Sequence, residues 1–342
     1  MKAVIKMKPI RVAHLGAAHD HSGLTLETVR KYPDVFTVVS VTEKDPAVRA
    51  RVENQSAYQG LTWITEEELF ARDDIDAVLC EGDELCALED AYRCIRKGWH
   101  VHMDKPAGTD IHRLEEMLAL AESKHLTFQT GYMYRYNPAM KYLRERVQSG
   151  KLGEILSIEA SMGVCHPDEK RAWLGRFQGG MMFFLGCHLI DMVYSLWGTP
   201  KRIVNFNQQA GNEITAQDNC LSVFEYEHGT AQIRVNAAEV NGYNRRHLVV
   251  CGSEGTVEIR PLECPTHVYE TLKCEAEGKT WRDAKHEVFP GYLPGRYDEM
   301  MLEFAQCIRG EKENPYPYAY EAQLQRLVLA ASGYQVDFTE KE

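Results

Sequence analysis

The stretch IRVAHLGAAHDHSG, residues 10–23, decides how the first part of the chain is expected to fold. Its apolar start is typical of a buried strand, and a helix is expected to follow it. Dinucleotide-binding chains place a glycine-rich turn between such a strand and helix. At G-x-G-x-x-G spacing only Gly16 is kept, because Ala18 and His21 stand at the other two positions. The turn alone therefore fits either a diverged nucleotide loop or an ordinary strand–helix turn.

Strand-like and helix-like segments alternate through the first 131 residues. Besides the first strand, strands are expected at 36–42, 75–80, 99–103 and 126–131. Helices are expected from residue 24 to Pro33, at 84–97 and at 110–124. This alternation predicts right-handed crossovers and a doubly wound parallel sheet.

The pattern changes to mostly antiparallel strands after residue 131. Apolar or alternating runs predict strands at 155–163, 203–208, 220–227, 230–239, 247–252 and 256–260. The turns His228-Gly229 and Ser253-Glu254-Gly255 predict two hairpins. Helices are expected near 138–149, 187–197, 298–309 and 319–333. The pattern predicts two domains, an α/β domain over residues 1–131 and an α+β domain over residues 132–342.

Composition excludes some classes of partner. The 342 residues carry a net charge of −11, spread along the chain, which argues against nucleic-acid binding. The apolar stretch 179–198 contains His188 and Asp191, so a buried helix is expected there rather than a membrane span. Residues 1–10 lack the apolar core of a signal peptide. We therefore expect a soluble cytoplasmic protein.

The ten cysteines show no C-x-x-C spacing. Four of them, Cys80, Cys86, Cys94 and Cys187, lie in apolar segments. Buried thiols in a reducing compartment are therefore expected.

Five collinear motifs resemble those of the Gfo/Idh/MocA oxidoreductases. They are KGWHVHMDKPAG (97–108), GYMYRYNP (131–138), SGKLGEI (149–155), GCHLIDMVYSLWG (186–198) and CGSEGTVEI (251–259). The first is similar to the family's "aGkHVlxEKP", with Asp104 in place of the usual Glu. The resemblance implies an N-terminal Rossmann domain that binds NAD(P) and a C-terminal domain with a large, mostly antiparallel open sheet. Because that sheet usually packs against a partner subunit, a homodimer or homotetramer is expected.

The resemblance also implies the reaction, an NAD-dependent hydride transfer between nicotinamide and a secondary alcohol or ketone. The expected partner is a small carbohydrate-like substrate, such as a sugar, polyol or related cyclic compound. Residues expected to contact the cofactor are Gly16, Ala18, His19, Asp20, Glu43, Lys44, Gly82, Asp83, Asp104, Lys105 and Arg135. Glu43 ends the second strand, where an acidic side chain binds ribose hydroxyls and repels a 2′-phosphate. This favours NAD over NADP.

Three residues are expected to act in catalysis by resemblance. Lys105 would hydrogen-bond the reacting oxygen, and His188 would transfer the proton. Asp191 lies on the same face of the expected helix as His188, where it would orient the helix or the histidine, or belong to a structural network.

Residues expected to bind the substrate are His166, Trp173, Phe184 and His188. Trp173 fits either a sugar-binding ring or a structural cluster. Phe184 is a departure, because inositol-dehydrogenase-like members carry Asp there. Two alternatives therefore stay open: an enzyme that cleaves glycosides through transient oxidation by bound NAD, and a non-catalytic NAD(H)-binding protein.

Two histidine pairs raise the question of a metal. His19 and His21 bracket Asp20, while His100 and His102 alternate along one expected strand. Both pairs are expected near the carboxyl ends of parallel strands, where a carboxylate would complete a zinc site. No compact ligand spacing exists, and His100 is the family's ordinary residue. We therefore expect no metal, and an ion among these four histidines is the alternative.

Overall fold

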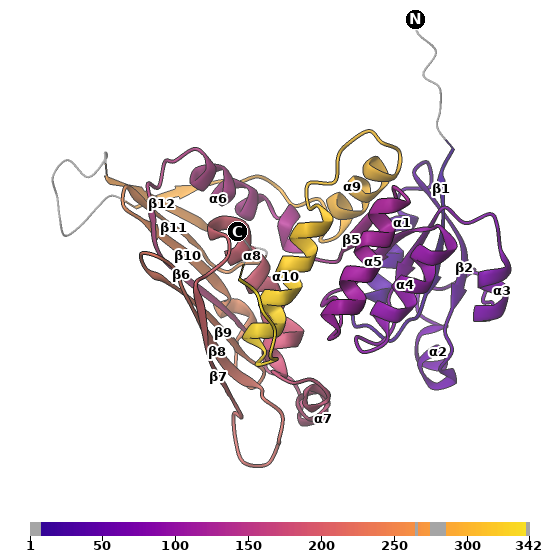
Figure 1. The fold of residues 1–342 in the computed structure, drawn as a ribbon, viewed down its shortest axis with the longest axis horizontal. Helices are drawn as coiled ribbons and strands as arrows, with labels where there is room; N and C mark the ends of the chain where they lie inside the picture. Colours follow the sequence, from indigo (N-terminus) through magenta and orange to yellow (C-terminus); the bar gives the residue numbers. More distant parts are fainter. Residues whose placement is uncertain (1–7, 264–265, 274–284, 340–342) are drawn as a thin grey trace, which may run out of the picture. The chain divides into compact units, whose positions relative to one another are not determined.

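The computed structural model describes residues 8–263, 266–273 and 285–339. The chain forms two compact units, each drawn in Figure 1. The first comprises the residues up to 133 together with 294–322, and the second comprises 134–293 together with the residues from 323 onward. The sequence places residues 294–322 in the second domain, whereas in the structure they pack with the first unit. The division into domains at residues 131 and 132 stays a prediction.

A five-stranded parallel sheet forms the centre of the first unit. Its strands are β1 (Ile10–Leu15), β2 (Phe36–Thr42), β3 (Ala77–Cys80), β4 (His100–Met103) and β5 (Phe128–Thr130). They lie side by side in the order β2-β1-β3-β4-β5 and are all parallel. From β1 the chain continues to β2 on one side, and from β3 it continues to β4 and β5 on the other side. This switch point makes a crevice at the carboxyl ends of β1 and β3, where ligands bind in such sheets. The predicted α/β fold of this part is confirmed.

The helices of the first unit lie between its strands along the chain, apart from one in the later part of the chain. They are α1 (Ser22–Arg30), α2 (Pro46–Val52), α3 (Glu66–Ala71), α4 (Ala87–Lys97), α5 (Ile111–Ser123) and α9 (Asp298–Ile308). Thr65 and Glu68 form a capping box at the start of α3, and Gly98 ends α4 in the left-handed conformation with φ 98°. Asp110 caps α5 through its carboxylate.

An eight-stranded sheet dominates the second unit. Its strands are β6 (Ile155–Gly163), β7 (Arg202–Gln208), β8 (Asn219–Glu225), β9 (Thr230–Asn236), β10 (His247–Gly252), β11 (Gly255–Ile259), β12 (Val268–Leu272) and β13 (His286–Val288). Their order is β13-β12-β11-β10-β6-β9-β8-β7. All pairs are antiparallel except β6 with β9, and the two predicted hairpins are confirmed. Strands β12 and β13 add two strands that the sequence does not predict.

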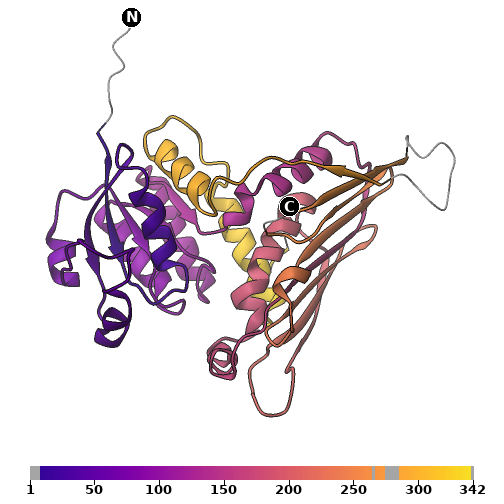
Figure 2. The same cartoon turned by 180° about the vertical axis from the view of Figure 1, so that it is seen from behind.

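The helices of the second unit cover one face of this sheet. They are α6 (Pro138–Gln148), α7 (Asp168–Trp173), α8 (Cys187–Trp197) and the later part of α10 (Tyr318–Ala331). Figure 2 shows α8 lying along the sheet, where it contacts β6 and β9. Burial alternates along β8, so every second side chain faces the covered side. Short 3₁₀ turns span Met133–Tyr136, Leu174–Arg176 and Tyr243–Arg245.

The apolar stretch 179–198 is the buried helix that the sequence predicts. It forms α8 and, just before it, a π-helical turn over Met182–Gly186. Within the described ranges, no helix combines the length and apolarity that crossing a bilayer requires. Of the four cysteines expected to be buried, Cys80, Cys94 and Cys187 are buried and Cys86 is half-buried. Residues 1–7, on which the signal-peptide argument rests, lie outside the described residues.

Candidate active site

The turn after β1 packs directly against the turn after β3. Gly16 has φ +82°, a left-handed conformation that favours glycine. A Cβ atom at Gly16 would lie 2.4 Å from the Cα of Gly82. The first glycine of the diverged motif is therefore required by this close approach of two backbones.

Glu43 is anchored at the end of β2. Its Oε2 accepts a hydrogen bond from the backbone N–H of Ala17 at 2.6 Å, and its Oε1 accepts one from the N–H of Asp45 at 2.8 Å. These contacts hold a carboxylate against the β1–α1 turn. This is the position of the ribose-binding acid in dinucleotide sites.

A cavity of about 150 Å³ lies at the carboxyl ends of β1, β2 and β3. Six residues predicted to bind the cofactor line it: Gly16, Ala18, Glu43, Lys44, Gly82 and Asp83. Three further acids, Asp45, Glu66 and Asp90, also line it and are not predicted as site residues. Burial raises the pKa of Asp90. The cavity is thus predominantly acidic. Among the described residues that line it, Lys44 is the one basic residue.

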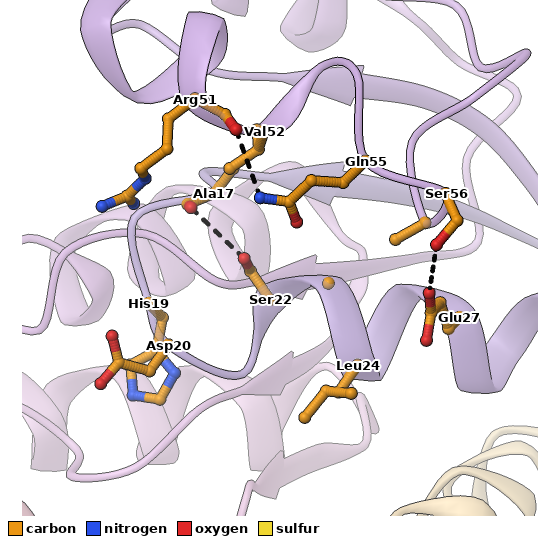
Figure 3. Close-up of a pocket in the computed structure, with 12 residues that line it drawn as sticks. Ala17, His19, Asp20, Ser22, Leu24, Glu27, Arg51, Val52, Gln55 and Ser56 are labelled. Atoms are coloured by element: carbon orange, nitrogen blue, oxygen red, sulfur yellow. Dashed lines mark hydrogen bonds between the residues drawn. The ribbon is translucent and has the colours of Figure 1, made fainter.

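A second cavity, of about 280 Å³, lies beside the same turn (Figure 3). His19 and Asp20, both predicted to contact the cofactor, line it together with residues of α1 and α2. The Ser22 hydroxyl donates to the Ala17 carbonyl at 3.3 Å and so closes the turn. The predicted cofactor residues of this loop therefore lie along two neighbouring cavities of one unit.

Lys105 and Asp104 are buried at the end of β4, with exposed fractions of 1% and 4%. Asp104 Oδ1 accepts a hydrogen bond from the Lys105 N–H at 2.7 Å. Asp104 Oδ2 lies 3.2 Å from His19 Nδ1 and 3.0 Å from His21 Nδ1. His21 occupies the position of the third motif glycine and is not among the residues that the sequence predicts to contact the cofactor.

A layer of buried polar side chains lies beneath this cluster, on the same face of the sheet. His14 on β1 and His102 on β4 are both paired in register with Leu79 on β3. The Nε2 atom of His102 lies 3.7 Å from Glu81 Oε1. Burial and the nearby Asp104 raise the pKa of Glu81 well above its usual range. Burial lowers the pKa of His14 and of His21 to about 4 in each case. These imidazoles are therefore neutral near pH 7.

The four-histidine group considered from the sequence is not assembled. His100 lies at the amino end of β4, where its Nδ1 accepts the N–H of Thr127. His102 Nδ1 bonds the Gln129 side chain at 3.0 Å, and its ring packs on Phe304. The expectation that His100 lies near the carboxyl ends is wrong, because His100 is the first residue of β4 and the carboxyl end of that strand is at Met103. His19, His21 and Asp104 are the residues whose ligand atoms come together.

In the second unit, His188 and Asp191 are both buried on α8, each 2% exposed. Asp191 forms a buried ion pair with Arg135. Two guanidinium nitrogens of Arg135 lie near Asp191 Oδ1, Nε at 3.0 Å and Nη2 at 2.9 Å. The ring of Tyr134 stands edge-on to His188 at 5.1 Å. The sequence left open whether Asp191 orients the helix or His188, or belongs to a structural network. The structure shows Asp191 in an ion pair with Arg135.

Two of the residues predicted to bind substrate lie together. Trp173, from the end of α7, stands edge-on to Phe184 with ring centroids 5.3 Å apart. The Lys170 amine lies 3.7 Å from the Trp173 ring centroid and 4.8 Å from that of Phe184. Phe184 belongs to the π-helical turn, a feature frequent at functional sites. His166 lies beyond β6, where its N–H bonds the Ala237 carbonyl.

Comparison with known proteins agrees with this architecture. Residues 140–258 match the GFO/IDH/MocA C-terminal domain family. A dTDP-3,4-didehydro-2,6-dideoxy-alpha-D-glucose 3-reductase from Actinomadura kijaniata is 31% identical over 60% of this chain and 61% of its own length. An uncharacterized oxidoreductase from Schizosaccharomyces pombe is 28% identical over 57% of this chain and 54% of its own. The chain thus spans about half the length of the first curated relatives that it matches.

Solved structures share the whole fold. A levoglucosan dehydrogenase in complex with NADH and levoglucosan superposes with a TM-score of 0.78, at 15% identity, covering 95% of this chain and 97% of its own. A 3-ketoreductase from Actinomadura kijaniata, in complex with TDP-benzene and NADP, gives a TM-score of 0.75 at 19% identity over 94% and 96% of the chains. The matched domain, the oxidoreductase relatives and the shared architecture confirm the resemblance carried by the five motifs. Residues 140–258 are therefore identified as a GFO/IDH/MocA C-terminal domain, and the chain as a whole shares the fold of solved oxidoreductases.

Proposed function

We propose that this protein is an NAD-dependent oxidoreductase acting on a secondary alcohol or ketone of a sugar, polyol or related cyclic compound. The observation that carries the proposal is the acid-lined cavity at the crevice between β1 and β3, with Glu43 anchored on the Ala17 N–H. Gly16 and Gly82 both line the cavity without a side chain, which allows the close backbone approach that a nucleotide requires. Relatives named as sugar reductases and dehydrogenases support the substrate class.

The preference for NAD follows from charge. Glu43, Asp45 and Asp83 line the cavity, and a 2′-phosphate placed there would face their carboxylates. A neutral ribose instead offers hydroxyl donors that a carboxylate accepts. The relatives are mixed, since one solved neighbour holds NADH and another holds NADP. We therefore base the preference on this chain's own acids.

When bound, the nicotinamide accepts or supplies the hydride, and the protein positions the substrate and moves a proton. We assign to Lys105 the hydrogen bond to the reacting oxygen, and to His188 the proton transfer. Burial of Lys105 at the end of β4 restricts its side chain. Arg135 holds Asp191 on α8, one turn from His188, and so fixes the helix that carries the histidine.

The test is turnover with NAD across a panel of sugars, polyols and cyclic alcohols, followed by NADH absorbance. For a substrate that reacts, Lys105→Met is expected to lower kcat by about 10²–10⁴, the range for a positioned proton-transfer group. Binding of NADH should persist, since the variant keeps the aliphatic stem. Lys151→Met, at an exposed lysine of the second unit, is the control. Unchanged turnover of Lys105→Met would remove Lys105 from the mechanism.

Phe184 favours a second candidate, a non-catalytic NAD(H)-binding protein. Its buried ring packs on Trp173, at the position where relatives of the inositol-dehydrogenase type carry a carboxylate. On this account NADH binds, the whole panel stays unreacted, and Phe184→Asp introduces activity. Turnover by the natural chain would exclude it.

A further inference from the structure

The proposed hydride transfer gives no chemical step to the cluster of His19, His21 and Asp104, although His19 and Asp104 are predicted to contact the cofactor. One ligand atom from each of the three lies within 4.8 Å of the other two. The Nδ1 atoms of both histidines face the same oxygen, Asp104 Oδ2, at 3.2 and 3.0 Å. All three residues belong to the first unit, two from the β1–α1 turn and one from the end of β4.

The hydrogen bonds of His19 leave a conflict in this cluster. Its Nε2 lies 3.2 Å from the Lys105 carbonyl oxygen, which only accepts, so Nε2 carries the hydrogen. Its Nδ1 accepts the His21 backbone N–H at 3.2 Å, as a nitrogen with a lone pair does. That same Nδ1 faces Asp104 Oδ2, another acceptor. A neutral imidazole has one N–H, and in His19 it is on Nε2. His19 Nδ1 and Asp104 Oδ2 are therefore two acceptors in van der Waals contact, with no hydrogen between them.

A bound cation removes this conflict. Metal-binding histidines commonly donate their other ring N–H to a backbone carbonyl or a carboxylate, which fixes the tautomer. His19 has both kinds of partner on its Nε2 side, the Lys105 carbonyl and Glu84 Oε1 at 3.7 Å. The contacts around His19 are therefore those of a metal ligand and its supporting shell.

The cluster is also held in place by its surroundings. A Cβ atom at Gly131 would lie 2.9 Å from Asp104 Oδ1, so the backbone of Gly131 packs against the carboxylate. The ring of Tyr297 lies 5.7 Å from that of His21. The observed nitrogen–oxygen distances of 3.0 and 3.2 Å are close to the ~3.3 Å between ligand atoms of a tetrahedral zinc ion with bonds of about 2.0–2.1 Å.

We propose that His19, His21 and Asp104 bind a divalent transition-metal ion of the zinc class. Two imidazole nitrogens and one carboxylate oxygen suit such an ion and leave coordination positions for water or a substrate oxygen. This site differs from the four-histidine alternative considered from the sequence, and the proposal departs from the expectation of no metal. Since His19 donates to the Lys105 carbonyl, a bound ion also fixes the backbone of Lys105. The proposal stands on this geometry and does not require the proposed function.

The test uses the full chain freed of metal with a chelator and then titrated with Zn²⁺ by calorimetry and with Co²⁺ by visible absorption. The natural chain is expected to bind one ion, with the d–d bands of a nitrogen- and oxygen-ligated Co²⁺. His21→Ala and Asp104→Asn should each weaken binding at least tenfold. His112→Ala removes an imidazole that is 91% exposed on α5 and is the matched control. Circular dichroism and thermal unfolding of the metal-free variants show that each is folded.

Absence of stoichiometric binding by the natural chain would overturn the proposal. Equal affinity of His21→Ala and the natural chain would also overturn it, because His21 is partly exposed and its loss leaves the core intact.

Discussion

At the scale of single residues, the contact between Gly16 and Gly82 predicts that alanine is far more destabilising at position 16 than at position 82. Gly16→Ala places a methyl group 2.4 Å from a backbone atom and forces a non-glycine residue to φ +82°. We expect the free energy of unfolding to fall by about 2–4 kcal/mol, the sum of left-handed strain and overpacking. Gly82→Ala is the control, because its nearest neighbours would lie at 3.6 and 4.0 Å. Urea denaturation compares them, and equal losses would contradict the assignment.

The buried ion pair of Arg135 and Asp191 makes a second prediction. Arg135→Met leaves the Asp191 carboxylate buried without its guanidinium, which should cost about 3–5 kcal/mol of unfolding free energy. The double variant Arg135→Met, Asp191→Leu should recover much of this loss, because no charge is left uncompensated. A double-mutant cycle by chemical denaturation measures the coupling. Additive losses would show that the two side chains act independently. The predicted role of Arg135 in cofactor binding stays a prediction.

Sequence reasoning worked best for residues whose role is local. The strain-tolerant glycine at 16 and the acid at 43 follow from the strand–turn–helix pattern, and the structure places both beside one cavity. The pairing of His21 with Asp104 could not be predicted, because it depends on where two distant loops meet. His100 belongs to the other end of its strand from His102: it is the first residue of β4, so only His102 lies toward the carboxyl end.

At the scale of elements, the capping box of α3 is the simplest feature to test. Thr65 Oγ1 accepts the Glu68 N–H at 3.2 Å, and Glu68 Oε2 accepts the Thr65 N–H at 2.8 Å. Thr65→Ala should lower the free energy of unfolding by about 1 kcal/mol. Thr62→Ala, at an exposed threonine just before the helix, should change it by less than about 0.5 kcal/mol. Equal midpoints for the two variants in thermal unfolding would argue against a working cap.

Elements with strong periodicity or clear end signals were predicted well. Helices α4 and α5 end or begin at Gly98 and Asp110, and the hairpins close at the predicted turns. Strand β13 was missed because its three residues, His286–Val288, are largely exposed and carry no apolar alternation. The π-helical turn at Met182–Gly186 was missed because an apolar run has the same composition in either helix type.

At the scale of the whole molecule, the buried histidine layer predicts how stability depends on pH. Burial lowers the folded-state pKa of His14 to about 4, against about 6.5 in the unfolded chain. The groups that face His14 are the Ser22 carbonyl, the Tyr58 ring and His102. The unfolded state therefore binds a proton that the folded state does not between pH 6.5 and 4. Stability should fall as pH drops through this window, by about 3 kcal/mol in total for this group.

Urea denaturation at several pH values from about 7 to about 4 measures this loss. The variant His14→Gln, which keeps a side-chain donor for Ser22, should show a flatter dependence than the natural chain. His102 and His21 also have lowered pKa values, so part of the slope should remain. An unchanged slope in His14→Gln would mean that other groups account for acid sensitivity.

The central claim, that the crevice of the first unit binds a nicotinamide cofactor with a preference for NAD, is tested most directly by calorimetry with the reduced nucleotides. The natural chain should bind one NADH per chain with a micromolar Kd, and NADPH at least tenfold more weakly. Glu43→Ala should reduce that ratio, since it removes the carboxylate that opposes the 2′-phosphate. Saturation by neither nucleotide, or tighter binding of NADPH, would contradict the account.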